Sequence, residues 1–439
     1  MRNIFKHIVI FIITLEARVV LFKYKPKIVA VIGSVGKTST KDAICAVLEK
    51  KFFVRCAPQS YNSDIGVPLT VLGVENGWES VQSWLSVFIE GLALIILKNH
   101  YPSLLVLEVG VQKPGDIKKI AKWLKPDIVV ITRFSEIPVH IEFFESRESL
   151  IMEKISLVKA LKKSGSLVLN ADDEDIRALH NTSMRNLSSI TFGFSDHADI
   201  QASNVEVFYD KKNMPEGIGC KVRYGDAIFP LKLYNTVGIQ YISVVLGAFG
   251  AGIALKMNMV TMLEALSSFS IPNGRFKLLL GIRGSLIIDD SYNSSPAAVF
   301  AALDSLEHVK MGATNSKNEG RKIVVLGDMM ELGKWSIEEH KKAGEKASRV
   351  ADIFIAVGLR SEKMWESALA NGMKLENTRH FNDSLEAISF LKNLPREGDI
   401  ILIKGSQSMR MEKIVKSLLR EPDRAHELLV RQEENWQRR

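Results

Sequence analysis

Cysteine is scarce in this 439-residue sequence, which contains only Cys45, Cys56 and Cys220. Three thiols so far apart along the chain form neither a disulfide framework nor the paired spacing of a structural zinc site. We therefore exclude the small disulfide-rich class of protein. The pattern indicates three small buried residues with free thiols, in a protein of a reducing compartment.

Long uninterrupted hydrophobic runs are also missing. Residues 4–22 are strongly apolar, but the uninterrupted part covers only residues 8–15, whereas a membrane-spanning helix needs about 20 apolar residues. No small-residue cleavage site follows, so we do not interpret the segment as a signal peptide. The interrupting polar residues are Lys6, His7, Glu16 and Arg18.

Three interpretations of residues 1–26 stay open: a helix packed on the next domain or on a partner, a helix lying in the plane of a membrane, or a span. Helical spacing favours the first two, because it gathers apolar side chains on one face, and Lys23, Lys25 and Lys27 follow. A second apolar stretch, residues 84–97, is predicted to be a buried helix. The apolar face of the first segment holds Ile4, Ile8, Phe11, Leu15, Val19 and Phe22.

The charge balance excludes some partners. The net charge is +8, and the sequence has no arginine-rich block and no aromatic-basic pattern of an RNA-binding module. We expect no nucleic-acid partner. A mild basic excess fits a protein that handles phosphates or lies near an anionic membrane. We expect a monomer in the cytoplasm, acting on small molecules, with contact to the inner face of the membrane if residues 1–26 touch lipid.

Short β-branched runs alternate with helical patterns from residue 27 onward, which predicts an α/β fold with mainly parallel sheets. The zone 190–235 is irregular and is predicted to form short antiparallel strands. The turn residues 271–274 mark the domain boundary. We expect an apolar N-terminal helix (1–26), an α/β domain (27–270), a second, smaller α/β domain (271–420) that includes a polar loop at 312–320, and a charged tail (421–439) that is helical or frayed.

The most informative segment is the turn after the apolar run 28–32. Gly33 and Gly36 let backbone N–H groups surround an anion, and the following helix adds its positive N-terminal end. Lys37 would contact the β- and γ-phosphates of a nucleotide, and the Thr38 hydroxyl would bind Mg²⁺. The alternative is an ordinary strand–helix turn, which the Lys-Thr pair after the second glycine disfavours.

Two further polar residues follow predicted strands of the same sheet. Glu108 comes directly after strand 104–107, and His140 lies in the loop after strand 128–132. Ligands of open parallel sheets bind at the carboxyl ends of the strands, so Glu108 is a candidate Mg²⁺ ligand and His140 a candidate for a second cation. Taken alone, each has a plain structural alternative, as a capping carboxylate and as a loop histidine.

Eight sequence blocks in this order resemble the Mur ligases, the ATP-dependent amide ligases of peptidoglycan synthesis. The resemblance covers residues 27–415, and the blocks at 289–293 and 326–333 point to the dipeptide-adding branch. The blocks are Gly33-Ser-Val-Gly-Lys-Thr, Asn62-Ser-Asp-Ile-Gly-Val-Pro, Leu107-Glu-Val-Gly, His140 with Lys154, Asn273-Gly-Arg, Asp289-Asp-Ser-Tyr-Asn, Leu326-Gly-Asp-Met-Met-Glu-Leu-Gly with His340, and Lys404-Gly-Ser with Arg410-Met-Glu.

The resemblance implies a P-loop-type ATP-binding domain at 27–270 and a Rossmann-like C-terminal domain at 271–420. It also implies a chemistry in which ATP phosphorylates a carboxylate and an amine then attacks the acyl phosphate. It implies ATP and two Mg²⁺ ions as cofactors, with D-alanyl-D-alanine added to a UDP-N-acetylmuramoyl-tripeptide-type precursor. It also implies that Lys154 is carbamylated by CO₂. The implied metal ligands are Thr38, Glu108, His140 and Lys154, and the implied catalytic residues are Lys37, His140, Lys154, Arg275 and Lys404.

The remaining implied contacts belong to the nucleotide and to the substrates. Nucleotide contacts fall on Gly33, Ser34, Val35, Gly36, Lys37, Thr38, Ser39, Arg275, Asp290, Tyr292 and Asn293. Substrate contacts fall on Asn62, Asp328, Glu331, Lys404 and Ser406, although Asp328 and Glu331 could equally cap or hold turns.

Three departures from the family pattern keep alternatives open. Residues 1–26 stand where the family has a UDP-binding domain, Tyr241 and Val244 replace two asparagines, and Gln407 replaces a frequent arginine. The first departure favours a different carboxylate, such as a polyamino acid or a modified wall precursor. The second would suit a non-catalytic nucleotide-binding scaffold. A kinase or GTPase is disfavoured because it would leave the second domain's blocks without a purpose.

Overall fold

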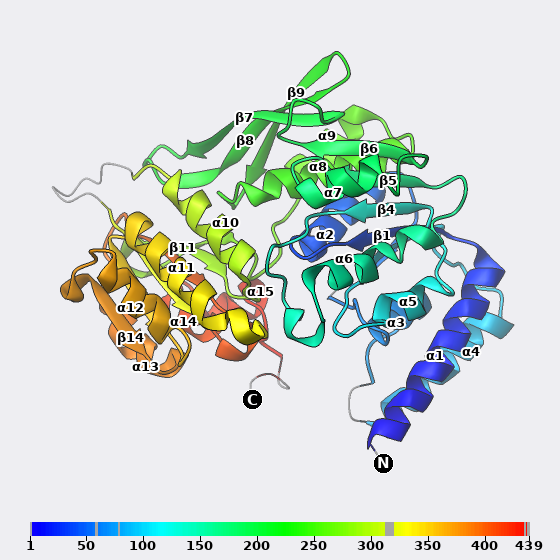
Figure 1. Cartoon of the computed structure of the whole chain (residues 1–439), viewed down its shortest axis with the longest axis horizontal. Helices are drawn as coiled ribbons and strands as arrows, with labels where there is room; N and C mark the ends of the chain where they lie inside the picture. Colours follow the sequence, from blue (N-terminus) through cyan, green and yellow to red (C-terminus); the bar gives the residue numbers. More distant parts are fainter. Residues whose placement is uncertain (1, 58–59, 78–79, 312–319, 434–435, 437–439) are drawn as a thin grey trace.

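The computed structural model describes residues 2–57, 60–77, 80–311, 320–433 and 436. Two β-sheets lie side by side, each covered by helices on both faces (Figure 1). This architecture confirms the predicted α/β class with mainly parallel sheets. The polar loop predicted at 312–320 lies, except for Gly320, outside the described residues.

The first sheet has nine strands in the order β2-β3-β1-β4-β5-β6-β7-β8-β9. Neighbouring strands from β2 to β7 pair in parallel, and β7, β8 and β9 pair antiparallel. The strands are β1 (Lys27–Ile32), β2 (Val54–Cys56), β3 (Leu104–Glu108), β4 (Ile128–Ile131), β5 (Ser166–Asn170), β6 (Ser188–Gly193), β7 (Ile200–Tyr209), β8 (Pro215–Tyr224) and β9 (Ala227–Tyr234).

Strand β1 shows why helices cover both faces of this sheet. Successive side chains of a strand point to opposite faces, and here Val29 and Val31 join one hydrophobic core while Ala30 and Ile32 join another. Helices α2, α8 and α9 cover the first face, and α1 and α3 to α7 the second. They are α1 (Arg2–Tyr24), α2 (Lys37–Leu48), α3 (Gly66–Leu72), α4 (Val81–Ile96), α5 (Asp116–Ala121), α6 (Arg147–Ile155), α7 (Glu174–Asn181), α8 (Gln240–Ala254) and α9 (Met259–Ser267).

The second sheet has six strands in the order β10-β11-β15-β12-β13-β14, and only β10 pairs antiparallel. Helices α10 to α12 cover one face, and α13 to α15 the other. Its elements are β10 (Lys277–Leu280), β11 (Leu286–Asp290), α10 (Pro296–Glu307), β12 (Lys322–Gly327), α11 (Ser336–Val350), β13 (Ile353–Val357), α12 (Glu362–Ala370), β14 (Thr378–Phe381), α13 (Ser384–Leu391), β15 (Ile400–Lys404), α14 (Glu412–Leu418) and α15 (Ala425–Leu428).

Short 3-10 helices connect several of these elements. They are η1 (Ile141–Phe143), η2 (Val158–Ala160), η3 (Ile282–Gly284), η4 (Gly333–Trp335), η5 (Leu375–Asn377), η6 (Gln407–Met409) and η7 (Pro422–Arg424).

The zone 190–235 differs from its prediction. The strands there are not short, since β7 and β8 have ten residues each, and β6 pairs in parallel with β5. The charged tail, expected to be helical or frayed, forms the short helices η7 and α15, and the side chain of Arg431 is buried against the second sheet's end.

Two of the three cysteines correct the prediction of free thiols. Cys45 of α2 and Cys56 of β2 form a disulfide, with their Cα atoms 6.5 Å apart, while Cys220 is a buried free thiol. The chain turns back after α2, which brings β2 beside that helix. The expectation of a reducing compartment therefore loses the support of these two residues.

The apolar stretch 84–97 was predicted to be buried, and this prediction is wrong. It forms most of α4, of which only Trp84, Val87 and Gly91 are buried. Hydrophobic composition predicts a helix with buried contacts but does not show which of its faces pack against other elements. Helix α1 packs through Val9, Ile13 and other residues onto the first sheet's helices, and no helix among the described residues meets the length and hydropathy needed to cross a membrane.

Candidate active site

The phosphate loop connects β1 to α2 through two glycines in left-handed or related conformations. Gly33 has φ 145°, and a Cβ there would lie 2.1 Å from the Thr132 Oγ1 atom. Gly36 has φ 79° and caps the N-terminus of α2. Glycine is therefore required at residue 33 by space and conformation together, and at residue 36 by conformation. The loop leaves the helix N-terminus open toward an anion.

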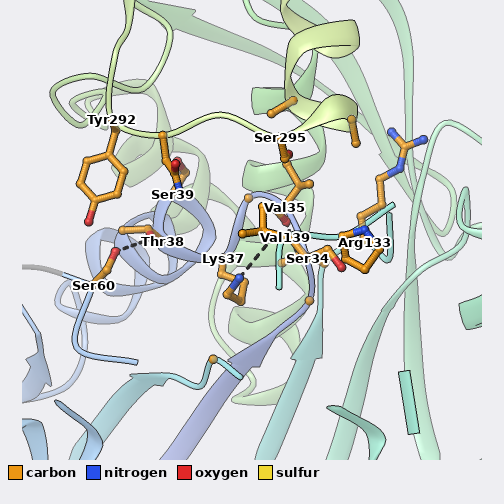
Figure 2. A pocket seen from close by; sticks show the side chains of 18 of the residues that line it. Ser34, Val35, Lys37, Thr38, Ser39, Ser60, Arg133, Val139, Tyr292 and Ser295 are labelled. Carbon is orange, nitrogen blue, oxygen red and sulfur yellow. Dashed lines mark hydrogen bonds between the residues drawn. The ribbon is translucent and has the colours of Figure 1, made fainter. Parts of the chain in front are cut away.

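A single cavity of about 1250 Å³ collects the candidate residues from both sheets. Figure 2 shows Ser34, Val35, Lys37 and Thr38 of the loop around it, with Tyr292 of the second sheet's side facing them. Asp328 is the one predicted site residue that does not line this cavity. The predicted site residues that line the cavity are Gly33, Ser34, Val35, Gly36, Lys37, Thr38, Ser39, Asn62, Glu108, His140, Lys154, Arg275, Asp290, Tyr292, Asn293, Glu331, Lys404 and Ser406.

Thr38 and Glu108 lie in contact, as expected for residues at or just beyond the carboxyl ends of neighbouring parallel strands. The Thr38 hydroxyl donates to Glu108 Oε2 at 2.8 Å, and the amide of Asn62 donates to Glu108 Oε1 at 2.8 Å. Ser60 Oγ lies 2.8 Å from Thr38 Oγ1 (Figure 2). Asn62, predicted to contact substrate, thus orients the Glu108 carboxylate in this structure while also lining the cavity.

These oxygen atoms suit a hard divalent cation. Mg²⁺ is commonly held by one or two protein oxygens together with nucleotide phosphates, rather than by an all-protein cage. Consistent with that mode, no group of three or more His, Cys, Asp or Glu side chains arranged for a metal occurs in the described part of the chain. The Thr38 and Glu108 pair fits the nucleotide-dependent kind of site.

Two lysines converge behind the loop. Lys37 Nζ donates to the Ser34 carbonyl at 3.4 Å (Figure 2), and Lys154 Nζ donates to Ser34 Oγ at 2.7 Å. Lys154 is only 4% exposed. Burial, followed by the positive charges of Lys37 and Arg147, lowers the pKa of Lys154 well below its usual value. Burial likewise lowers the pKa of Lys37. Burial therefore favours the neutral, nucleophilic form of the amine most strongly at Lys154, whereas the Glu108 carboxylate opposes this effect at Lys37.

His140 enters the cavity from a left-handed backbone position, with φ 72°. Burial, with the charges of Lys37 and Lys154, lowers the pKa of His140 to about 4, so the imidazole is neutral near pH 7. Its Nδ1 atom lies 2.8 Å from Glu331 Oε2, a carboxylate of the second domain. A neutral imidazole is the form that binds metal ions.

Arg275 joins the two sheets at the phosphate loop. It lies in the turn before β10, its Nη2 donates to Thr38 Oγ1 at 3.3 Å, and its guanidinium stacks 3.8 Å from the Tyr292 ring centre. Tyr241 donates to the Arg275 carbonyl at 2.7 Å and lies near Ser39. Tyr241, a departure from the family pattern, therefore fixes the backbone that presents Arg275.

Asp290 and Lys404 face each other across neighbouring parallel strands. They are register partners in β11 and β15, and their side chains form an ion pair of 2.7 Å. Lys404 also donates to the Asn293 carbonyl at 2.9 Å. Burial, partly offset by the Lys404 ammonium, raises the pKa of Asp290. The pair places one cation and one anion at the carboxyl ends of the second sheet.

Asp328 and His340 lie under the loops instead of facing the cavity. Asp328 accepts from the Ser361 backbone N–H at 2.7 Å, and His340 accepts from the Met329 backbone N–H at 3.0 Å. Ser406, which lines the cavity, also accepts from the Met330 backbone N–H at 2.9 Å. These contacts hold the loop that carries Glu331.

Several cavity residues were not predicted. Ser60 precedes the Asn62 block without a signal of its own, and Arg133 follows β4. Trp436 comes from the C-terminal tail, where Arg410 donates to its carbonyl at 2.9 Å. The contacts of this tail are with residues of the second sheet's side that lie far away in the sequence, so no local pattern predicts them, whereas Arg410 belongs to one of the family blocks.

Two family models match the chain. One, described as Mur ligase middle domain, matches residues 91–234, and the other, Mur ligase, glutamate ligase domain, matches residues 274–407. A similar curated protein is the UDP-N-acetylmuramoyl-tripeptide--D-alanyl-D-alanine ligase of Bacillus subtilis, 27% identical over 92% of this chain and 79% of the relative. The ligase of the same name from Mycobacterium leprae is 28% identical over 87% of this chain and 71% of its own length.

Solved structures show the same fold. MurF from Acinetobacter baumannii superposes with a TM-score of 0.73 at 21% identity, covering 92% of this chain and 79% of that one. MurF ligase from Thermotoga maritima in complex with ADP gives 0.74 at 24% identity, covering 93% and 83%. A pseudomurein peptide ligase type C from Methanothermus fervidus gives 0.61 at 19% identity, covering 90% and 80%.

Proposed function

We propose that this chain, which belongs to the Mur ligase family, joins a carboxylate to an amine at the expense of ATP. The reaction we propose is the addition of D-alanyl-D-alanine to a UDP-N-acetylmuramoyl-tripeptide, the activity in the names of its relatives. The observation that carries the proposal is the contact between Arg275 and Thr38, which brings the second domain onto the phosphate loop above Glu108.

The phosphoryl-transfer step needs positive charge around the γ-phosphate. The substrate carboxylate attacks the γ-phosphorus, the bond to the bridging oxygen breaks, and ADP leaves with that electron pair. Lys37 and Arg275 lie on two sides of the loop and would neutralise charge that develops on the transferred group. The loop N–H groups at the start of α2 would hold the other phosphates.

The amide-forming step takes place at the acyl phosphate. The substrate amine attacks the acyl carbon, inorganic phosphate leaves, and the amine gives up a proton. Lys404 and Ser406 lie at the ends of β15 and line the cavity, where they would orient the incoming dipeptide. The buried Asp290 holds Lys404 in place through their 2.7 Å ion pair.

We propose two Mg²⁺ sites in this cavity. Thr38 and Glu108 would hold the first, and His140 together with a carbamylated Lys154 would hold the second. Bound there, Mg²⁺ would offset the repulsion between the nucleotide phosphates and the substrate carboxylate. The low pKa of His140 supports this role, because the neutral ring is available as a ligand above about pH 5.

Carbamylation of Lys154 is supported by its burial. A neutral amine attacks CO₂ and releases a proton, which converts the lysine into an anion that binds metal. Lys154 is 4% exposed and its pKa is lowered well below the usual value, so the reactive form is populated. The neighbouring Ser34 hydroxyl, 2.7 Å away, is positioned to stabilise the carbamate.

We further propose the domain limits 27–270 and 271–420 and a monomeric enzyme. Helix α9, the last helix that covers the first sheet, ends at Ser267, and the second sheet begins at Lys277. The Arg275 turn between them would act as the hinge. Because the reaction consumes ATP, we place it inside the cell.

The experiment measures ADP release with Mg²⁺-ATP and D-alanyl-D-alanine, with or without UDP-N-acetylmuramoyl-tripeptide, and reads the product by mass. We expect an adduct only with both substrates. Lys37→Ala should reduce its rate by at least about a hundredfold, since it removes a charge on the transferred phosphoryl group. Lys163→Ala, an exposed lysine on the same domain, is the matched control. If Lys37→Ala still formed the amide at the normal rate, the proposed mechanism would be wrong. If ADP were released without an adduct, UDP-N-acetylmuramoyl-tripeptide would not be the acceptor of the dipeptide.

A further inference from the structure

Helix α1 carries an exposed apolar stripe along its outer face. Phe11 is 70% exposed and Phe22 79% exposed, although both are large aromatic side chains. The stripe repeats every three or four residues, which keeps it on one side of the helix. It consists of Ile4, Ile8, Phe11, Leu15, Val19 and Phe22, with Phe5 at its edge.

Helix α4 carries a second stripe of the same kind. Val81, Leu85, Ile89, Leu92 and Ile96 are all at least half exposed, and Leu97 continues the stripe beyond the helix. Half of the large hydrophobic side chains that are exposed among the described residues belong to these two helices and Leu97. Single exposed apolar residues are ordinary, but a continuous set of this size marks an interaction surface.

The two helices pack side by side and run in the same direction. Glu16 of α1 lies against Gly91 of α4, where a Cβ would come within 2.3 Å of its carboxylate oxygen. Seven residues further along α1, Lys23 donates to the carbonyl groups of Leu94 and Ile95 at the end of α4. Figure 1 shows the two helices together at one edge of the molecule, and the exposed side chains of both stripes therefore belong to that edge. We call these two stripes the α1/α4 face.

Basic side chains gather at the common C-terminal end of the pair. Lys23, Lys25, Lys27 and Lys98 are all exposed there, and Lys25 lies 5.9 Å from the Phe22 ring centre. Glu90 is the one exposed acidic side chain described on α1 and α4. An apolar stripe flanked by lysines is the composition of helices that lie in the interface of an anionic membrane.

The packing of α1 excludes a spanning arrangement. Its inner face holds Val9, Ile13, Ala17 and Val20 in the hydrophobic core, each 2% exposed or less. Inserting α1 across a bilayer would remove these side chains from the core and expose to water the apolar surface that they cover. The outer stripe, by contrast, is already free to enter a lipid surface.

A second copy of the chain is a poorer match for this face than lipid. A copy would offer Glu90 as its exposed carboxylate on the described helices, against lysines on both partners. Anionic headgroups offer a phosphate to each lysine, and their acyl chains accept the apolar stripes. The charge of the face thus selects lipid over self-association.

We propose that the α1/α4 face docks the protein onto an anionic lipid bilayer, with both helices lying in the plane of the surface. Lys6 of α1 also lines the cavity of the candidate active site, so docking would place that cavity close to the headgroups. The docking does not depend on the ligase reaction, and its test needs no turnover.

The experiment is co-sedimentation of the full chain with vesicles of phosphatidylcholine alone or mixed with phosphatidylglycerol. We expect binding to the anionic vesicles that weakens as salt rises. Phe11→Glu with Ile89→Glu should reduce the partition coefficient at least tenfold. Both side chains are well exposed, so the fold should tolerate the change. Leu375→Glu, an equally exposed apolar residue of the second domain, is the matched control and should bind as the unchanged protein does.

A second variant separates the charge contribution. Lys25→Glu with Lys27→Glu should abolish the preference for anionic vesicles while leaving thermal unfolding unchanged. Failure of the unchanged protein to bind either vesicle, or equal binding by the Phe11 and Ile89 variant, would overturn the proposal. The proposal would also be overturned, in favour of docking by a second copy, if the unchanged protein formed a dimer in sedimentation velocity without lipid and the Phe11 and Ile89 variant did not.

Discussion

At the scale of single residues, the site depends on lysines whose charge is unfavourable where they lie. Lys154 and Lys37 share the region behind Ser34, and the charge of Lys37 adds to burial in lowering the pKa of Lys154. Removing a lysine from water costs free energy unless it is paired or neutral. In this cavity the unfavourable burial is the property that makes Lys154 reactive.

Lys154 gives a direct test of the carbamate. Lys154→Ala should lower the ligase rate about a hundredfold or more, because it removes a metal-binding anion. Lys154→Glu should recover part of the rate, since a carboxylate replaces the carbamate. In buffer depleted of CO₂ the unchanged enzyme should slow while Lys154→Glu does not. Equal CO₂ dependence of the two proteins would contradict the role.

Sequence reasoning located the residues at strand ends and missed those brought in from afar. Glu108 was predictable because it directly follows a buried strand, and its contact with Thr38 follows from the register of β3 with β1. Arg431 and Trp436 were not predictable, because their positions depend on how the last turns of the chain pack. For Asp328 the sequence left two alternatives, a substrate contact or a turn-holding carboxylate, and its bond from the Ser361 backbone N–H agrees with the second.

At the scale of elements, the α1–α4 contact buries an acidic group without a partner. Glu16 is 9% exposed, and its Oε2 atom has no hydrogen-bond partner. Burial raises the pKa of Glu16 to about 7. The folded state therefore holds this proton more tightly than the unfolded chain, so the free energy of unfolding falls as pH rises from about 4.5 to 7.

Glu16→Gln should remove this penalty. Without lipid, we expect the variant to be more stable than the unchanged protein by about 2 kcal/mol at pH 8, with the difference vanishing near pH 4.5. Chemical denaturation at several pH values measures it. Glu90→Gln, on the exposed side of α4, should change stability by less than about 0.5 kcal/mol. A pH-independent effect of Glu16→Gln would refute the assignment.

The C-terminal tail offers a contrast between buried and exposed ion pairs. Arg431 is buried and donates to Glu412 Oε2 at 3.1 Å and to the Ser291 carbonyl at 3.2 Å. Arg431→Ala should destabilise the protein by about 3 kcal/mol, since it leaves a buried carboxylate short of a partner. Arg424→Ala, whose pairs are exposed and screened by water, should leave the stability nearly unchanged. Thermal unfolding measures both, and equal shifts would contradict this account.

Elements that are apolar along their whole length were predictable. Partly buried strands, and the exposed face of an apolar helix, were not. The apolar run 28–32 became β1 because a strand buried on both faces is apolar throughout. Strands β2, β10 and β14 were missed because none of them is buried along its whole length, whereas the equally short β4 is buried and apolar throughout. Helix α4 shows the other limit, since hydrophobicity alone does not distinguish a core face from a docking face.

At the scale of the whole molecule, Arg275 couples the two sheets. Its side chain reaches Thr38 while its carbonyl accepts from Tyr241, so movement of the second domain moves a cation at the phosphate loop. The sequence predicted both the two-sheet architecture and a turn at this point. It did not predict the hydrogen bond between Arg275 and Thr38, which depends on side chains from opposite sides of the cavity.

Arg275→Ala should uncouple the domains without unfolding them. We expect kcat to fall about a hundredfold, because a cation on the transferred phosphoryl group is lost, while the unfolding temperature changes little. Arg283→Ala, an arginine outside the cavity that bonds to Asn393, is the control and should keep full activity. Normal kcat in Arg275→Ala would show that Arg275 acts only as a structural contact.

The position of Lys6 in the wall of the cavity has a kinetic consequence. A protein held by α1 and α4 at a bilayer searches for its substrates along a surface, and one wall of its cavity belongs to the same helix that holds it there. Turnover of any acceptor that shares this surface would follow the number of molecules per unit area. Diluting the suspension would leave that rate unchanged, whereas adding empty vesicles would lower it.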